Sequence, residues 1–217
     1  MRTLRTTVLL AALCASTTAG AQTYYYGEPQ SSPGSNFYGS VVYQLGIPVG
    51  NTHDYISDVS WRGIGVDLAW LLKPNFSLGL ALGWNVFYVN TNTTINYLPG
   101  NKEPGFAISG NQDRSFNFFP LLFNVRYLPR LKNGVHPFLG LGIGGYVTTE
   151  YLGIGLSSYS QTAFMFGLAP EIGVIIPVEG GAAIQFSVRY NMAFAGGGID
   201  FQQWVGLSLG VAWGKGL

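Results

Sequence analysis

The sequence has few charged residues and a single cysteine. Charged side chains make up 10% of the 217 residues, against about a quarter in a typical globular domain. A soluble protein with so few charges could not cover its surface, so something other than water must face much of this chain. The one cysteine, Cys14, lies in a segment that we expect to be removed. The mature chain therefore has no thiol for a disulfide, a metal or a nucleophilic reaction.

Long apolar runs and basic stripes are also missing. Beyond residue 21, no apolar run reaches the roughly 18 residues that a membrane-spanning helix needs. The absence of a basic stripe argues against nucleic acid as a partner. An apolar composition without a spanning helix leaves one membrane structure, the closed β-barrel, in which strands satisfy one another's backbone hydrogen bonds.

The N-terminus has the three parts of a secretory signal peptide. Arg2 and Arg5 supply positive charge, residues 8–15 form a short apolar segment, and Ala19-Gly20-Ala21 supplies small residues for cleavage. An N-terminal anchor helix is disfavoured because the apolar segment is much shorter than the ~20 residues that span a bilayer. We predict three segments: a signal peptide at 1–21, a periplasmic lead-in at 22–35 and the barrel domain at 36–217.

The rest of the chain alternates between large apolar residues and small or polar ones. This period of two is typical of β-strands with one apolar face, and 76–88 is the clearest case. The pattern predicts an all-β fold, an eight-stranded antiparallel up-and-down transmembrane β-barrel. The predicted strands lie within 37–47, 62–72, 76–88, 119–127, 139–148, 164–176, 184–194 and 205–213.

Side-chain size decides which face of each strand is the lumen. Eight strands enclose too little space for the bulky residues, so the glycine-rich face must line the lumen and the bulky face must meet lipid. The connections alternate in length, as an outer-membrane barrel requires. Short turns are expected on the periplasmic side at 73–75, 129–134 and 178–181, and longer outer loops at 49–60, 90–115, 150–161 and 195–202.

Aromatic residues on the lipid-facing positions form two groups. Aromatic bands at both membrane interfaces are typical of such barrels, because these rings have one wet edge. The alternative is a soluble β-sandwich in which they are ordinary core residues. The group near the periplasmic ends is Phe37, Trp70, Phe76, Tyr127 and Trp213, and the group near the outer ends is Trp84, Tyr88, Phe119, Phe164 and Phe194.

Several segments together carry a resemblance to a known family. They are 119–127, 137–142, 166–173, Val188-Arg189-Tyr190-Asn191 and the last strand, which ends at Trp213. With them the chain resembles the porin-family, OmpA-like and OmpW-like small barrels of the Gram-negative cell envelope. The resemblance covers 36–213 and implies insertion by the outer-membrane assembly machinery. One departure is that residues 214–217 follow Trp213, whereas such barrels commonly end on an aromatic residue.

Four charged residues are predicted to point into the lumen: Asp67, Arg126, Glu171 and Arg189. Counted from the short turns, all four lie in the periplasmic half, so two acids and two bases can neutralise one another. Unpaired, each would carry a heavy desolvation cost. We expect a static polar plug; the alternative is a gated constriction that passes small ions. Glu150 also points inward, but near the outer rim.

Few residues suggest catalysis or metal binding. His53 has Asp54, Ser57 and Asp58 nearby in the first outer loop, which leaves a lipid-modifying enzyme as a further alternative. His136 is too far from His53 in the sequence to share a metal site with it. We expect no catalytic residue, no metal and no cofactor.

The sequence thus predicts an integral bacterial outer-membrane protein with a structural or surface-interaction role. The alternative is a porin-like conduit for ions or small hydrophobic compounds. The expected partners are outer-membrane lipid and lipopolysaccharide, the assembly machinery and an extracellular ligand at the outer loops, above all at 90–115. We expect the barrel to be a monomer.

Overall fold

The computed structural model describes residues 36–73, 75–97, 106–129, 134–154, 157–178 and 180–214. Within these ranges, only the backbone is described for the residues that fall in 92–111 and for residues 154 and 157. The predicted signal peptide at 1–21, the lead-in at 22–35 and the last three residues lie outside these ranges, so they stay predictions.

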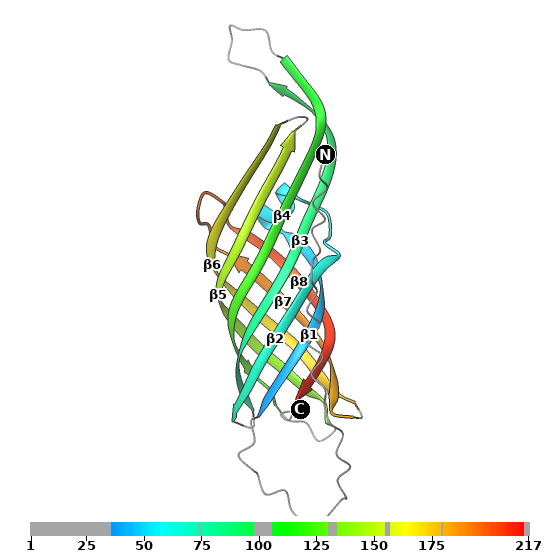
Figure 1. The fold of residues 1–217 in the computed structure, drawn as a ribbon, viewed down its shortest axis with the longest axis vertical. Helices are drawn as coiled ribbons and strands as arrows, with labels where there is room; N and C mark the ends of the chain where they lie inside the picture. Colours follow the sequence, from blue (N-terminus) through cyan, green and yellow to red (C-terminus); the bar gives the residue numbers. More distant parts are fainter. Residues whose placement is uncertain are drawn as a thin grey trace, which may run out of the picture. The chain divides into compact units, whose positions relative to one another are not determined.

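Eight antiparallel strands close into one barrel, each hydrogen-bonded to its neighbours in chain order (Figure 1). Closure removes every sheet edge, so the backbone groups find their partners on the next strand. The first and last strands complete the circle, with Tyr38 opposite Gly214 and Val49 opposite Gln203. The predicted fold class is confirmed. The strands are β1 (Phe37–Val49), β2 (Arg62–Lys73), β3 (Phe76–Tyr97), β4 (Phe106–Tyr127), β5 (His136–Ile154), β6 (Ser157–Pro177), β7 (Ala182–Ala193) and β8 (Gln202–Gly214).

The strands are longer at their outer ends than the sequence analysis predicts. The predicted loop 90–115 is wrong, because β3 and β4 stay paired from Asn90 opposite Asp113 to Tyr97 opposite Phe106. The predicted loop 150–161 is mostly strand as well, since β5 and β6 pair as far as Ile154 opposite Ser157. The apolar alternation stops where both faces of a strand meet water, although backbone pairing continues. β3 and β4 extend beyond their neighbours at this end (Figure 1).

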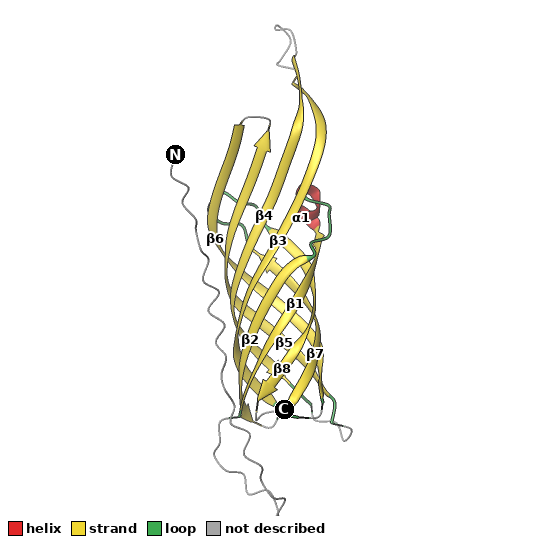
Figure 2. Cartoon of the chain, turned by 45° about the vertical axis from the view of Figure 1, so that its right-hand side comes forward, coloured by secondary structure: helices red, strands yellow, loops and turns green. Residues whose placement is uncertain are grey.

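The connection from β1 to β2 contains the short helix α1 (Gly50–Tyr55), drawn red in Figure 2. Buried Thr52 ties this helix to β8: its Oγ1 donates to Gln202 Oε1 at 2.8 Å and accepts from the Gln203 backbone N–H at 2.8 Å. Ile56, directly after the helix, is fully buried. No described helix is long and apolar enough to cross a membrane.

Side chains point to the two faces as the alternation predicts. Many large apolar residues of the strands are exposed on the outside, among them Phe123 and Leu139, whereas small and polar residues and a set of buried aromatic rings line the lumen. Two lumen glycines show why small residues are needed there. A Cβ at Gly167 would lie 2.6 Å from the Tyr146 ring, and a Cβ at Gly173 would lie 2.5 Å from the Phe138 ring. The core of the protein is therefore the lumen itself.

Candidate functional site

The four predicted lumen charges meet in one cluster, which we call the ion quartet: Asp67, Arg126, Glu171 and Arg189. Arg126 on β4 and Glu171 on β6 both lie opposite Gly140 on β5, and Glu171 lies directly opposite Arg189 on β7. Asp67 comes from β2, which pairs with none of these strands. It therefore reaches the other three across the lumen.

Each arginine of the quartet bridges both carboxylates. Arg126 Nη2 lies 2.5 Å from Asp67 Oδ2 and 2.8 Å from Glu171 Oε2, and Arg126 Nε donates to that same oxygen of Glu171 at 3.1 Å. Arg189 Nη2 lies 3.1 Å from Glu171 Oε1 and 3.4 Å from Asp67 Oδ1. The result is a closed ring of ion pairs with no net charge, and no member is more than 5% exposed.

Neighbouring lumen residues hold the quartet in place. Gln185 Nε2 donates to Asp67 Oδ2 at 3.3 Å, and the Arg126 guanidinium lies 4.9 Å from the centre of the Phe138 ring. Gly140 leaves the space that Arg126 needs, since a Cβ there would lie 2.9 Å from Arg126 Cγ. These contacts compensate the buried charges, although the Arg189 Nε has no hydrogen-bond partner among the described residues.

An aromatic layer fills the lumen on the outer side of the quartet. We define it as Phe87, Phe116, Phe118, Tyr146 and Trp204, none of which is more than 1% exposed. The Phe118 and Trp204 rings stack with their centroids 4.3 Å apart, and the edge of the Tyr146 ring meets Trp204 at 5.6 Å. Ile56 packs into the same cluster. Two successive layers of buried side chains, the ion quartet and the aromatic layer, thus lie along the lumen.

Phe116, Phe118 and Trp204 of the aromatic layer were missed because the predicted strands were too short at their outer ends, whereas Phe87 and Tyr146 fall within the predicted strands 76–88 and 139–148. The predicted fourth strand began at 119 and the eighth at 205, just past Phe118 and Trp204. A signal was available: continuing the alternation of Pro120 and Leu122 backwards places Phe118 and Phe116 on the lumen face.

The ten predicted interface aromatics all occupy outward-facing positions. Three pairs of these rings are in contact: Phe37 with Trp70 at 5.2 Å, Phe76 with Tyr127 at 5.1 Å, and Trp84 with Phe119 at 5.9 Å. The first two pairs lie at the short-turn end of the barrel, whereas Trp84 and Phe119 lie in the middle of β3 and β4. Trp213, Tyr88, Phe164 and Phe194 are likewise exposed on the outside. Their role as membrane-interface bands remains a proposal.

A cavity of about 450 Å3 opens at the outer mouth of the barrel, and Phe116 of the aromatic layer lines it. Three carboxylates, those of Asp54, Glu150 and Asp200, line it as well. Tyr55 also lines this mouth cavity, where burial and the neighbouring Glu150 carboxylate raise its pKa to about 12. The mouth is therefore an anionic surface.

The residues that suggested an enzyme do not converge. His53, Asp54, Ser57 and Asp58 are all exposed, on α1 or just after it. Within the described ranges, His53 makes no hydrogen bond or ion pair with the other three, and no three His, Cys, Asp or Glu side chains are placed to hold a metal ion. His136 lies at the start of β5.

No protein-family model and no curated protein matches the chain. Among solved structures, Neisserial surface protein A (NspA) is similar with a TM-score of 0.54 at 16% identity, over 82% of this chain and 97% of NspA. Ail, the attachment invasion locus protein of Yersinia pestis, gives a TM-score of 0.50 at 11% identity, over 82% of this chain and 96% of Ail. The outer membrane protein OprG from Pseudomonas aeruginosa gives a TM-score of 0.48 at 12% identity, over 82% of this chain and 94% of OprG.

At these identities the comparisons concern the fold alone, and the similarity to NspA and Ail agrees with the closed barrel. The family resemblance seen in the sequence is confirmed at that level. The chain is a small eight-stranded β-barrel of the Gram-negative outer-membrane type, similar in fold to NspA and Ail.

Proposed function

We propose that this protein acts through its outer surface, in a structural or surface-interaction role, and that its lumen is closed to solutes. The observation that carries this proposal is the pair of buried layers, the ion quartet and the aromatic layer. They lie one after the other along the lumen, so a solute would have to displace both. The quartet is then a static plug rather than a gate.

The energetics of the quartet support a permanent closure. Passage of an ion would separate the arginines from their carboxylates inside a narrow lumen. Removing one partner from a buried ion pair costs roughly 3–5 kcal/mol, because the remaining charge is left without compensation. An eight-stranded barrel is just wide enough to be filled by its own side chains, so water has little room to take over that compensation.

The outer end offers the surface on which partners would be recognised. Asp54, Glu150 and Asp200 make the mouth cavity anionic, which favours partners of positive charge. The paired extensions of β5 and β6 add the exposed aromatic rings of Tyr151 and Tyr159. The extracellular ligand expected from the sequence is therefore proposed to bind at this end.

Conductance across a planar bilayer tests the proposal. We expect the refolded wild-type protein to show no steady single-channel openings, because both layers would have to move. Arg126→Ala and Arg189→Ala each disturb only the quartet, so they are expected to remain closed too. The control is Lys73→Ala, which removes a charge outside the lumen. Steady wild-type openings that change in size with Arg126→Ala but not with Lys73→Ala would support the conduit instead.

A further inference from the structure

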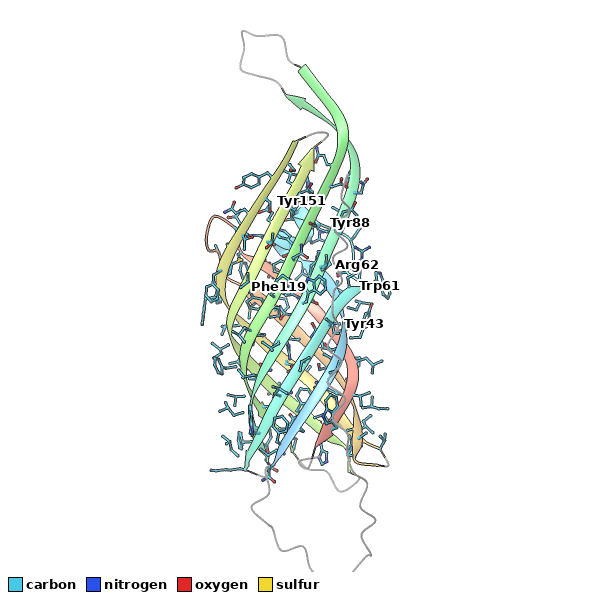
Figure 3. The ribbon with its side chains drawn as sticks, viewed as in Figure 1. Tyr43, Trp61, Arg62, Tyr88, Phe119 and Tyr151 are labelled. Carbon is cyan, nitrogen blue, oxygen red and sulfur yellow. The ribbon has the colours of Figure 1, made fainter. Side chains whose placement is uncertain are left out.

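An apolar groove runs along the outside of the barrel near the outer aromatic group. We call it the outer-wall groove and define it by Tyr43, Arg62, Ile64, Trp84, Val86 and Asn117, which line a hollow of about 450 Å3. A second hollow of about 190 Å3 continues it along the wall past Val66 and Leu82, and the two share Ile64 and Trp84. Figure 3 shows Tyr43, Trp61 and Arg62 close together on this part of the wall.

The groove exists because two strands separate there. The β1–β2 ladder ends with Tyr43 opposite Ile64, and the two segments meet again only at an isolated bridge formed by Ser60. Trp61, between these points, stands away from the wall with 67% of its surface exposed. Hydrogen bonds from Tyr43 Oη to the Trp61 carbonyl and from Ser60 Oγ to the Val86 carbonyl hold the segment in this position. The opening is therefore part of the fold.

Arg62 is the cation of this groove, and its guanidinium is unpaired. In the described part of the chain the Arg62 guanidinium makes no hydrogen bond or ion pair, whereas those of Arg114, Arg126 and Arg189 all make them. Asp58 and Arg62 line the adjoining hollow without forming an ion pair, and the Asp113 carboxylate accepts hydrogen bonds from Tyr88 and Asn90 rather than from Arg62. An unpaired guanidinium on an apolar surface would be stabilised by an anionic ligand.

The level of Arg62 on the wall indicates what that anion is. Arg62 lies opposite Val86, between the outward-facing rings of Trp84 and Tyr88 on β3. Aromatic rings of barrels lie at the level of the lipid headgroups, and arginine pairs with phosphate through two parallel hydrogen bonds. The hollow that continues along Ile64, Val66 and Leu82 is apolar and points away from the outer end, as an acyl chain would.

We propose that the outer-wall groove binds one phosphorylated lipid of the outer leaflet, lipid A. Its phosphate contacts the Arg62 guanidinium, and one acyl chain lies over Ile64 and Leu82. Asn117 accepts a hydrogen bond from Trp84 Nε1 at 3.4 Å, which leaves its amide N–H groups to donate to the headgroup. Lipid A is the occupant because the groove lies at the outer end of β2, away from the three short turns. The assignment depends on placement in the outer membrane and not on closure of the lumen.

Native mass spectrometry of the folded protein in detergent tests this site. Bisphosphorylated lipid A is titrated against the wild type, and we expect one molecule bound. Arg62→Gln should lower the affinity about tenfold, since it removes charge-assisted hydrogen bonds. The same lipid without its phosphates should bind the wild type about tenfold more weakly and should not distinguish the wild type from Arg62→Gln. Ile64→Trp, which fills the groove, should also weaken binding.

The matched control is Lys73→Gln, which removes an exposed charge at the other end of β2 and should leave the affinity unchanged. A heat-dependent shift in gel mobility verifies that each variant is folded, and the dephosphorylated lipid tests the wild type without any substitution. Equal affinity of wild type and Arg62→Gln for lipid A overturns the proposal, as does equal binding of the dephosphorylated lipid. Phosphatidylglycerol that binds as tightly, with the same loss in Arg62→Gln, would overturn the assignment to lipid A.

Discussion

Arginine has opposite surroundings on the two faces of this barrel wall. Arg126 is buried and bonded to two carboxylates, whereas Arg62 is exposed on the apolar outer face and its guanidinium has no described partner. A guanidinium in a dry lumen must be neutralised by the protein's own acids. One at the level of the headgroups can instead be neutralised by a lipid. Because neighbouring residues of a strand point to opposite faces, a shift of one residue along the strand decides whether an arginine is neutralised by the protein or by a lipid.

Gly140 allows a test at the scale of one residue. Gly140→Ala would place a Cβ 2.9 Å from Arg126 Cγ and 3.7 Å from Glu171 Oε2. Since the Arg126 side chain is fixed by its ion pairs, we expect the substitution to lower the free energy of unfolding by about 1–3 kcal/mol. Urea-induced unfolding in detergent micelles measures this change.

The control for that prediction is another lumen glycine beside the quartet. A Cβ at Gly206, opposite Arg189, would lie 3.4 Å from Asn191 Nδ2 and 3.7 Å from the Arg189 carbonyl oxygen, which are ordinary contacts. Gly206→Ala should therefore change the stability by much less. An equal loss in both variants would mean that crowding of Arg126 is not the cause.

At the scale of elements, Thr52 ties helix α1 to β8, and Tyr55 at the end of the helix also contacts Phe116 and Arg114 of β4. Thr52 is buried and joins α1 to two consecutive residues at the start of β8. This contact keeps the β1–β2 connection over the mouth of the barrel and allows Ile56 to reach the aromatic layer.

Thr52→Val should release this connection. The substitution keeps the shape of the side chain but leaves the Gln203 N–H and the Gln202 carboxamide oxygen without their partner, at a cost of about 1–3 kcal/mol. We expect faster hydrogen exchange at the Gln203 amide and faster proteolysis within 50–61. Asn51→Ala, at the exposed neighbouring position, is the control. Unchanged exchange in Thr52→Val would show that α1 is held by other contacts.

At the scale of the whole molecule, the ion pairs of the quartet link strands that are not neighbours in the barrel. Asp67 and Arg126 are 59 residues apart in the chain, and Asp67 and Arg189 are 122 residues apart. The backbone ladder joins only neighbouring strands, so these ion pairs add cross-links that the ladder does not provide. Their loss should affect the stability of the entire barrel rather than that of one strand.

Arg126→Ala is expected to destabilise the barrel by roughly 3–5 kcal/mol, because it leaves Asp67 and Glu171 short of a partner. The folded barrel should migrate differently from the boiled chain on a gel, and the temperature of that shift should fall in Arg126→Ala. Arg62→Ala removes an exposed, unpaired arginine and should leave the temperature unchanged. A wild-type chain that migrates identically before and after boiling would contradict the barrel itself.

Local alternation was enough to predict much of this protein. A period of two is a property of the strand itself, so it assigned the eight strands, the lumen and lipid faces, and the inward direction of Asp67, Arg126, Glu171 and Arg189. It failed where strands leave the bilayer, because both faces are then wet and the contrast that marks a strand disappears. The predicted loops at 90–115 and 150–161 were wrong for that reason.

The tertiary structure alone decided which of these residues meet. Inward direction does not determine that Arg126 bridges Asp67 and Glu171, because that depends on the register of strands far apart in the sequence. The aromatic layer likewise requires Phe118 and Trp204, from β4 and β8, to reach the same level of the lumen. The outer-wall groove results from a gap in the β1–β2 ladder, which leaves no periodic signal. The sequence by itself therefore determined the direction of the side chains within the predicted strands, and only closure of the barrel decided their partners.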